Sequence, residues 1–406
     1  MSIDINRLKY FFANVAFFWF LSFYPFLVLL NSFGYIELYG LYKVSILLCL
    51  VVTTLQMITI HKLKFSTIAV SISLSLFLSV VVLIFGSEGV YGVLDNGVNK
   101  SILNYFLPFI LNSIAIFIIG YQINIKKIIS SKLIFILLLP VVFILLHVRG
   151  FRLDYSLLKD PSLIGIYLIV GDALCFSAAL FCFRKGVNLS SFFLASFFMV
   201  VLYLNNSRAA FFIFSVGVLL TCWLFLITRR TGFALIISVI AIAIIMLFQK
   251  EIVTILSLNE RMALVFSGSS DYSLNSRDNL LNSGLESISG HWLIGDLGGQ
   301  INSSGRLGGY IHNILAYWRQ FGIVVFILLL LPVLYLIMYM VKMSIYVSEI
   351  DMDVYLICLS CLIISTMMIF FARSIPYSLL FLSLSMVDSF RIERLNRATK
   401  HVNVRY

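Results

Sequence analysis

Charged residues are scarce in this sequence. Only 12% of its 406 residues are Asp, Glu, Lys or Arg, whereas hydrophobic residues make up 61%. An ordinary soluble domain carries roughly 25% charged residues. A soluble chain of this length could not hide so much apolar surface from water in its cores. The low charge therefore excludes a soluble globular protein and indicates a chain whose middle lies in lipid.

Histidine and cysteine are also few, with five and six residues. No two histidines fall at metal-ligand spacing, and the one Asp-x-Asp pair is Asp351 with Asp353. Every cysteine lies in an apolar run, so we expect buried thiols without a disulfide framework, including Cys358 and Cys361. The sequence has no Walker or dinucleotide-binding loop. We therefore predict neither a metal nor a cofactor, and the substrate must supply the energy of any reaction.

Long apolar runs dominate what is present. Many exceed the ~18 to 20 residues that a helix needs to cross hydrocarbon, whereas barrel strands are ~10 residues long and alternate in polarity. The first run is too long for a signal peptide and has no small-residue cleavage site after it, so we expect a retained span. The predicted fold is an all-α bundle of about twelve transmembrane helices, at residues 10–31, 41–60, 67–86, 101–122, 132–148, 163–183, 190–206, 209–228, 233–249, 321–342, 354–371 and 376–390.

The distribution of Lys and Arg predicts the orientation of this bundle. The formal charge of +11 does not by itself imply nucleic-acid binding, and we expect none. With the N-terminus inside, seventeen basic residues fall in cytoplasmic segments and twelve on the opposite side, five of them in residues 249–320. The positive-inside rule is weak for such long segments. The short loops therefore predict that both termini are cytoplasmic.

Residues 249–320 form the one extended polar stretch. The segment is rich in Ser, Asn, Gly and Asp, and Leu280, Leu281, Leu285 and Ile288 recur at helical spacing within it. A loop of this length is too long for a plain connector and is usually functional or disordered. We therefore divide the chain into nine spans (1–248), a large outer loop with short helices (249–320), three further spans (321–390) and a cytoplasmic tail (391–406).

Two arginines are candidate anion ligands. Arg208 lies between two apolar runs in "YLNNSRAAFF", with Asn206 beside it, and a charge in such a place marks a functional site unless it snorkels to the headgroups. Arg277 opens the amphipathic stretch "NSRDNLLNSGLESI". A guanidinium and a helix N-terminus aimed at one spot would bind phosphate. The alternative for Arg277 is a solvated loop residue paired with Asp278.

The return of the loop to the membrane carries a candidate base. His312 and Asn313 precede the tenth apolar run, and Arg306 and Arg319 flank them. Histidine has the ordinary pKa that suits a general base near neutral pH. An interfacial polar residue without a catalytic role is the equally open alternative.

Three further charges could take part. Asp172 lies inside the sixth run, where a carboxylate marks either an ion path or a buried polar contact. Arg149 and Arg152 lie on the outer loop before it and could meet an anionic ligand.

These motifs together resemble the bacterial O-antigen polymerase and O-antigen ligase superfamily. The resemblance rests on "NSRAA" closing a span, an Arg in the large loop before "GHWLIG", and "HN" followed by "FGI" entering the next span, at about 205–215 and 275–325. The loop form "HPLxG" often seen in that superfamily is "HWLIG" here, at His291. The resemblance implies a GT-C-like helical membrane protein of the bacterial inner membrane that transfers glycans from undecaprenyl pyrophosphate.

The resemblance also implies roles for individual residues. Arg208 and Arg277 would hold the pyrophosphate, His312 would be the catalytic residue, and Asn206 and Asn313 would support them. The expected partners are the undecaprenyl-pyrophosphate-linked oligosaccharide, membrane lipids, a chain-length regulator and a flippase. The transfer would need no metal and would invert the anomeric centre.

Three other functions stay open at this point. A ligase would differ from a polymerase only in the acceptor, which is the lipopolysaccharide core in place of a second repeat unit. A flippase or other transporter fits twelve spans, but the sequence lacks an internal repeat and has little charge within the spans. A structural scaffold would leave the loop motifs unexplained.

Overall fold

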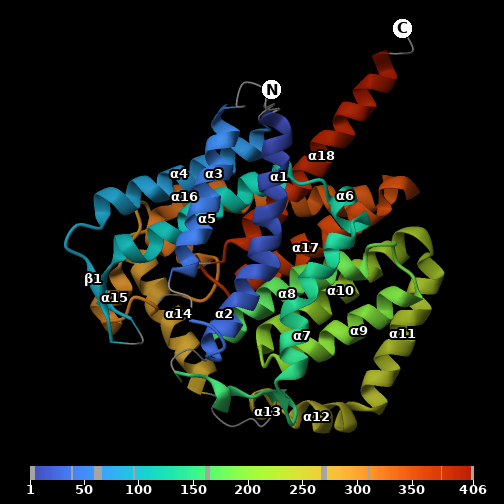
Figure 1. Ribbon diagram of the computed structural model, residues 1–406, viewed down its shortest axis with the longest axis horizontal. Coiled ribbons are helices and arrows are strands. Elements are labelled where there is room, and N and C mark those ends of the chain that lie inside the picture. The colour runs from blue at the N-terminus through green and yellow to red at the C-terminus, as the bar shows by residue number, and fades with distance from the viewer. Residues whose placement is uncertain are drawn as a thin grey trace.

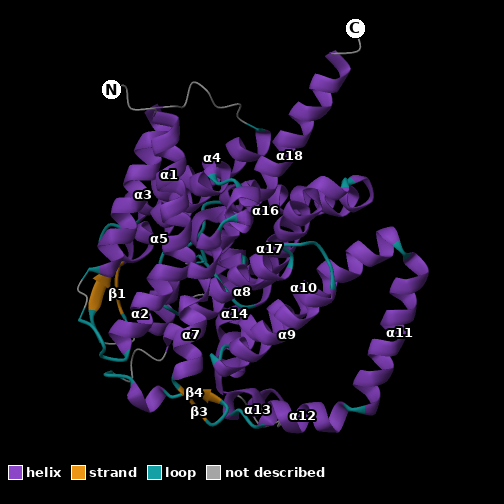
Figure 2. Ribbon diagram, turned by 45° about the vertical axis from the view of Figure 1, so that its right-hand side comes forward, coloured by secondary structure: helices purple, strands orange, loops and turns teal. Residues whose placement is uncertain are grey.

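The computed structural model describes residues 5–37, 40–58, 66–94, 97–160, 165–266, 272–309, 311–375 and 377–403. The chain is almost entirely helical, with two small antiparallel hairpins at one end (Figures 1 and 2). The long elements before the polar segment are α1 (Ile5–Phe18), α2 (Tyr24–Ser32), α3 (Leu41–Ile58), α4 (Thr67–Gly86), α5 (Ile102–Gln122), α7 (Leu139–Leu146), α8 (Ile166–Cys182), α9 (Leu189–Leu204), α10 (Arg208–Arg229) and α11 (Thr231–Leu247). The elements after it are α16 (Leu315–Tyr346), α17 (Met352–Phe371) and α18 (Leu379–Asn403).

Within the described residues, each of the twelve predicted apolar runs is mainly helical. Six helices are long and apolar enough to cross a membrane: 7–32, α4, α5, α10, α16 and α17. Four shorter apolar helices cover Val44–Gln56, Lys132–Leu146, Ile166–Cys182 and Leu189–Leu204. The all-α class and the membrane character of the chain therefore agree with the sequence, while the count of twelve crossings stays a prediction.

Two predicted spans are interrupted within the chain. The first contains a π-helical turn, Trp19–Phe23, where the Ser22 hydroxyl donates to the Ile136 carbonyl over 2.5 Å. The tenth span begins earlier than predicted, at Leu315, and is broken at Gly322, whose φ of 83° suits glycine. The Ile323 amide donates to the carbonyl of Trp292 in the loop. The start of α16 therefore contacts the polar segment, and Trp318 also stacks on Phe326 beyond the break.

The centre of the bundle is formed by α5, α17 and α18. Their facing side chains are almost wholly buried. Gly120 of α5 lies directly against α18, because a Cβ there would stand 2.9 Å from the Leu382 carbonyl oxygen and closer still to Ser385. Small residues of this kind let two helices approach closely in lipid.

One charged pair of α18 is buried inside the protein. Asp388 is fully buried and accepts hydrogen bonds from Tyr121 at 2.5 Å and from Ser66. Its other oxygen pairs with Arg391 at 2.7 Å. A buried carboxylate is tolerated only when it is paired and hydrogen-bonded in this way.

The described part of the polar segment is folded into short helices. It forms α12 (Gln249–Ser257), α13 (Glu260–Phe266), α14 (Tyr272–Gly290) and α15 (Gly299–Ser304). The hairpins β1–β2 (Tyr91–Val93, Asn99–Ser101) and β3–β4 (Val148–Arg149, Arg152–Leu153) lie at the same end. The start of α1 and the end of α18 lie at the opposite end (Figures 1 and 2). The orientation of these two ends in the membrane stays a prediction.

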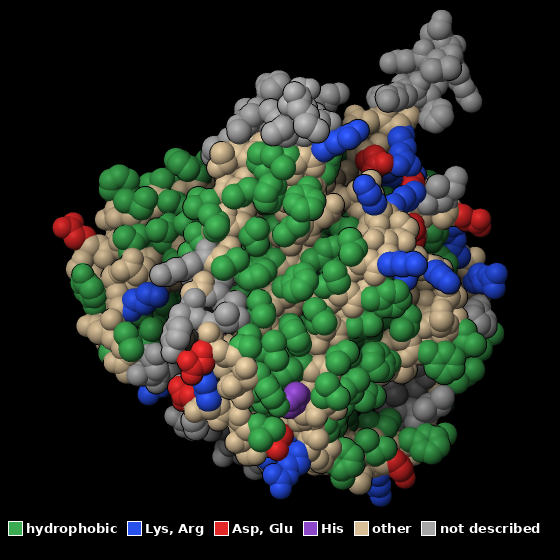
Figure 3. Space-filling view, in the orientation of Figure 1, with side chains coloured by type: hydrophobic (Ala, Val, Ile, Leu, Met, Phe, Trp, Pro, Cys, Tyr) green, Lys and Arg blue, Asp and Glu red, His purple; other side chains and the backbone are tan. Residues whose placement is uncertain are grey.

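The surface between the two ends is apolar. Hydrophobic side chains cover the middle of the face in Figure 3, and Lys, Arg, Asp and Glu gather mainly towards its edges. Helix α11 stands away from the bundle (Figure 2), and Leu235, Ile236 and Val239 along it are exposed. Such a surface suits contact with acyl chains.

Candidate anion-binding site

The site starts from the turn between α9 and α10. Asn205 is fully buried, and its side-chain amide donates to the Tyr167 carbonyl of α8 at 2.9 Å. The next residue, Asn206, has a φ of 61°, a left-handed conformation that asparagine tolerates better than most residues. The turn packs on Gly171, where a Cβ would lie 3.0 Å from the Ser207 hydroxyl. These contacts fix the position at which α10 begins, with Arg208 as its first residue.

A cavity of about 280 Å³ opens beside this turn. Four arginines from four separate segments line it, and its described lining contains no carboxylate side chain. Arg208 begins α10, Arg261 lies in α13, Arg277 lies in α14 and Arg373 follows α17. Phe212, Ile213 and Phe371 are among the apolar residues that complete the lining. The predicted convergence of Arg208 and Arg277 is therefore present in the structure.

Several polar atoms at this cavity are buried without a partner in the described part of the chain. They are the side-chain oxygens of Asn206 and Ser207 and the Nη1 nitrogen of Arg261. Ser207 precedes α10, yet its side chain does not cap the helix. Buried polar atoms are nearly always hydrogen-bonded, and an unpaired one costs about 1–3 kcal/mol. The Ser207 hydroxyl and Arg261 Nη1 are donors, whereas the Asn206 oxygen is an acceptor. Two unsatisfied donors beside an uncapped helix N-terminus favour an anionic ligand.

Arg261 is held firmly in place. Asn259 donates from its side-chain amide to the Phe151 and Tyr203 carbonyls, and its oxygen accepts the Arg261 amide at 3.1 Å. The Arg261 guanidinium then lies 4.4 Å from the centre of the Tyr167 ring. This cation–π contact leaves the guanidinium edge available for hydrogen bonds.

Asp172 is the partner of Arg373. The carboxylate accepts from Nε and Nη2 of Arg373 at 2.7–3.2 Å, and Nη1 of the arginine donates to the Ala372 carbonyl. Both residues are buried. The structure therefore assigns Asp172 to a buried polar contact, one of the two alternatives left open by the sequence. The pair fixes one wall of the cavity and neutralises the charge of Arg373.

His312 adjoins this group without being part of the cavity lining. Burial and, to a smaller extent, the nearby positive charges of Arg277 and Arg373 together lower the pKa of its imidazole to about 4. The imidazole is therefore neutral at physiological pH. A neutral ring can accept a proton from, or orient, a hydroxyl group, and an anion bound between the two arginines would raise its pKa again.

The other predicted ligands lie outside the cavity lining. The Asn313 side chain accepts the Leu315 amide and so starts α16. Arg319 is buried, and its Nε donates to the Ser287 hydroxyl at 3.3 Å, so it joins α16 to α14. Arg306 has an exposed side chain beside β1.

The two arginines of the β3–β4 hairpin also lie outside the cavity lining. Arg149 is exposed and lies 3.8 Å from Asp154, and Arg152 is half-buried in β4. Neither lines the arginine cavity. These five residues therefore lie away from the arginine cavity, and their predicted part in substrate binding stays a prediction.

Sequence reasoning missed Arg261 and Arg373. Both were counted only as loop charges when the orientation was predicted. Arg373 is 201 positions from Asp172, so no local pattern joins them. The buried start of α13 at Asn259, in "SLNERMAL", is the one signal that could have drawn attention to Arg261.

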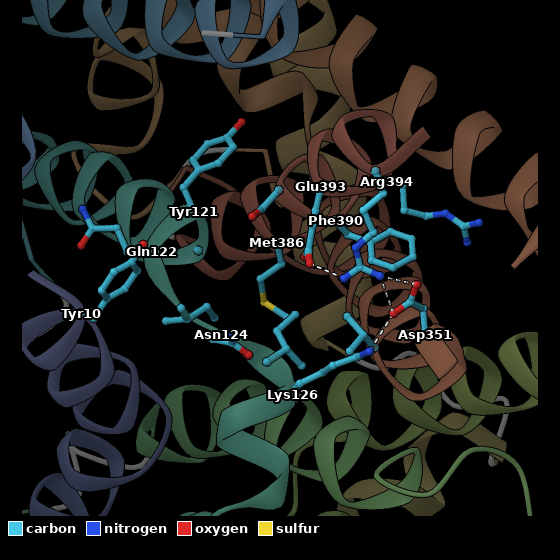
Figure 4. A pocket seen from close by; sticks show the side chains of 16 residues that line it. Tyr10, Tyr121, Gln122, Asn124, Lys126, Asp351, Met386, Phe390, Glu393 and Arg394 are labelled. Carbon is cyan, nitrogen blue, oxygen red and sulfur yellow. Dashed lines mark hydrogen bonds and ion pairs between the residues drawn. The ribbon is translucent and has the colours of Figure 1, made fainter. Parts of the chain in front are cut away.

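Polar residues also surround a cavity of about 200 Å³ at the opposite end of the molecule (Figure 4). Asp351 binds Lys126 at 2.7 Å and Arg397 at 3.0 Å, and Arg397 also pairs with Glu393. These ion pairs neutralise the charges of the cluster. They also join α6 (Ile125–Ser130) and α18 to the residue that precedes α17. Asp351 is thus committed to ion pairs, and the described residues contain no group of three or more His, Cys, Asp and Glu placed to hold a metal.

Comparison with protein-family models and with curated protein sequences finds no match to this chain. The resemblance to the O-antigen polymerase and ligase superfamily therefore rests on its short motifs. It contributes to the function proposed below together with the geometry of the arginine cavity.

Proposed function

We propose that this protein is a polymerase of O-antigen or a related surface polysaccharide, in a bacterial inner membrane. It would join repeat units carried on undecaprenyl pyrophosphate, at the membrane face that holds residues 249–320. One observation carries this proposal: arginines from α10, α13, α14 and the end of α17 line one cavity, next to the neutral imidazole of His312.

The chemistry of a diphosphate suits the cavity. Guanidinium groups bind phosphate oxygens with two parallel hydrogen bonds, and each charge-assisted bond contributes about 1.5–3 kcal/mol. Arg208, Arg261 and Arg277 approach from different segments, so together they can surround both phosphates. The diphosphate is also the leaving group, and the same arginines stabilise the charge that develops on it without a metal.

His312 would act as the general base of the reaction. The acceptor hydroxyl oxygen bonds to the anomeric carbon of the donor sugar, and the bond from that carbon to the diphosphate oxygen breaks. The hydroxyl proton passes to the imidazole of His312. A diphosphate near Arg277 and Arg373 raises the pKa of His312, so the bound substrate makes the base stronger. Attack from the side opposite the leaving group inverts the anomeric centre.

The polyprenyl chain has an apolar path from the cavity. Phe212 and Ile213 of α10 and the exposed Phe371 line the cavity itself. Val216 and Leu219, further along α10, are exposed, and so is most of α11. A chain whose diphosphate sits at the arginines can therefore run along α10 in the lipid.

Glycan length patterns test the proposal. Arg208→Ala, Arg277→Ala and His312→Ala are each expected to remove chains longer than one repeat unit in a strain whose own gene is deleted. Arg149→Ala, in the exposed β3–β4 hairpin, is the matched control and keeps the wild-type ladder. Wild-type ladders from both His312→Ala and Arg277→Ala contradict the proposal.

A ligase is the runner-up, because it would use the same donor site. The deletion strain separates the two functions: loss of a polymerase leaves the core with a single repeat unit, and loss of a ligase leaves the core bare. Loss of a flippase, a further alternative, would leave the repeat units on the cytoplasmic face of the membrane.

A further inference from the structure

A second strongly basic cavity lies at the other end of α10. Its volume is about 700 Å³, and its lining comes from the α8–α9 turn, the end of α10 and the start of α17. Arg184 and Lys185 lie in the first of these segments, and Arg229 and Arg230 in the second. Glu349 and Asp353 lie in the third.

In the part of the chain that the structure describes, ion pairs do not neutralise the basic side chains that line this cavity. Among the described residues, no ion pair joins Arg184, Lys185 or Arg230 to a carboxylate, and the Arg229 side chain donates to the Val347 carbonyl. Two basic residues of the cavity in Figure 4 differ from them, since Lys126 and Arg397 both bind Asp351. Four cations and two carboxylates leave the lining with two net positive charges.

The location of the cavity points to a lipid ligand. Helix α10 has 22 residues, a length of about 33 Å, which matches the ~30 Å hydrocarbon thickness of a bilayer. The arginine cavity at Arg208 and the second cavity at Arg229 therefore lie near opposite membrane surfaces. Val187, Phe225 and Met352 add apolar lining to the second cavity. Trp223 of α10 and the apolar side chains along α11 are exposed on the pair of helices beside this cavity.

We infer that this cavity binds the headgroup of an anionic glycerophospholipid in the leaflet on the side of the chain termini. The phosphodiester groups contact Arg184, Lys185 and Arg230, and the acyl chains lie along α10 and α11. A headgroup with two phosphates matches the net charge of the lining best. Basic pockets between membrane helices on the cytoplasmic side bind such headgroups. This site is separate from the diphosphate site and does not depend on the proposed transfer reaction.

The test is native mass spectrometry of the full chain in detergent, titrated with cardiolipin, phosphatidylglycerol or phosphatidylethanolamine. The variant Arg184→Gln/Lys185→Gln/Arg230→Gln leaves the Arg229 bond to Val347 intact. Each cation near an anionic lipid is worth about fivefold in affinity, so we expect cardiolipin to bind about a hundredfold more weakly to this variant. The control Lys127→Gln/Lys132→Gln/Lys342→Gln removes three exposed charges outside the cavity.

The inference predicts a specific loss. Cardiolipin binding falls in the cavity variant and not in the control, phosphatidylglycerol binds more weakly than cardiolipin, and phosphatidylethanolamine does not compete. An equal loss in both variants, or no loss in either, overturns it. Displacement of the lipid by millimolar inorganic phosphate also overturns it, because a soluble anion would then be the ligand. Retained thermal stability of both variants shows that they are folded.

Discussion

At the scale of single residues, Arg261 gives a direct test of the site. Asn259 holds its backbone amide, and the Tyr167 ring holds its guanidinium. Arg261→Ala removes a donor whose Nη1 has no partner in the described structure, and it should raise KM for the lipid-linked donor about 10- to 100-fold. Arg261→Lys should recover only part of this loss, because an ammonium group cannot bind phosphate oxygens in a fork. Initial rates at varied donor concentration measure the effect. Tyr167→Phe keeps the ring under the guanidinium and serves as the control, and an unchanged KM in Arg261→Ala would remove Arg261 from the site.

The protonation of His312 gives a second prediction at this scale. Its pKa of about 4 lies below the ordinary 6.5, so the ring is neutral above about pH 4 and becomes charged only below it. Arg277→Gln removes one of the charges that lower this pKa, and the titration should therefore move to higher pH. NMR of histidine-labelled protein can follow it, since the chain has five histidines and His312→Gln identifies the signal. A midpoint near 6.5 in the wild type would contradict the buried position described here.

The buried pair Asp172–Arg373 is a third residue-scale test. Asp172→Asn leaves a buried guanidinium without its counter-charge, and breaking such a pair costs about 3–5 kcal/mol. We expect a marked fall in the melting temperature of the detergent-solubilised protein. Asp172→Leu/Arg373→Leu removes both charges and should be more stable than Asp172→Asn. Equal melting temperatures for the wild type and Asp172→Asn would show that Asp172 and Arg373 do not form this ion pair in the protein.

At the scale of elements, the crossing of α5 and α18 depends on Gly120. A Cβ at this position would overlap Ser385 and crowd the Leu382 carbonyl, so Gly120→Ala should destabilise the protein by about 1–3 kcal/mol through overpacking. Gly165→Ala is the matched control, because nothing lies within 4 Å of its added methyl group. Thermal unfolding compares the two. A wild-type melting temperature for Gly120→Ala would mean that the helices are further apart than described.

The elements also show what the sequence could and could not predict. The apolar runs coincide with helical segments in the described chain, because burial in lipid or in the bundle demands the same composition along each one. The interruption at Gly322 was missed, since glycine occurs in many regular membrane helices and only the contact with Trp292 explains its conformation. Motif order located Arg208, Arg277 and His312, whereas Arg261 and Arg373 depend on contacts between distant segments. The amphipathic pattern correctly predicted the helix that became α14.

At the scale of the whole molecule, the orientation in the membrane can be tested with cysteine labelling. All six native cysteines are buried and free, so their background reaction should be low. Ser289→Cys, exposed at the end of α14, should react with a membrane-impermeant maleimide in intact spheroplasts. Lys127→Cys, at the other end, should react only after the membrane is opened. Reaction of Lys127→Cys in intact spheroplasts would reverse the predicted orientation.

The central claim also concerns the whole molecule: distant parts of the chain form one site for a lipid-linked diphosphate. Equilibrium binding of undecaprenyl pyrophosphate and undecaprenyl phosphate to the purified protein tests it most directly. We predict that the wild type prefers the diphosphate and that Arg208→Ala, Arg261→Ala and Arg277→Ala each weaken its binding about 10-fold or more, while Arg149→Ala does not. Equal binding of the two lipids by the wild type, or wild-type affinity for the diphosphate in all three variants, would contradict the account.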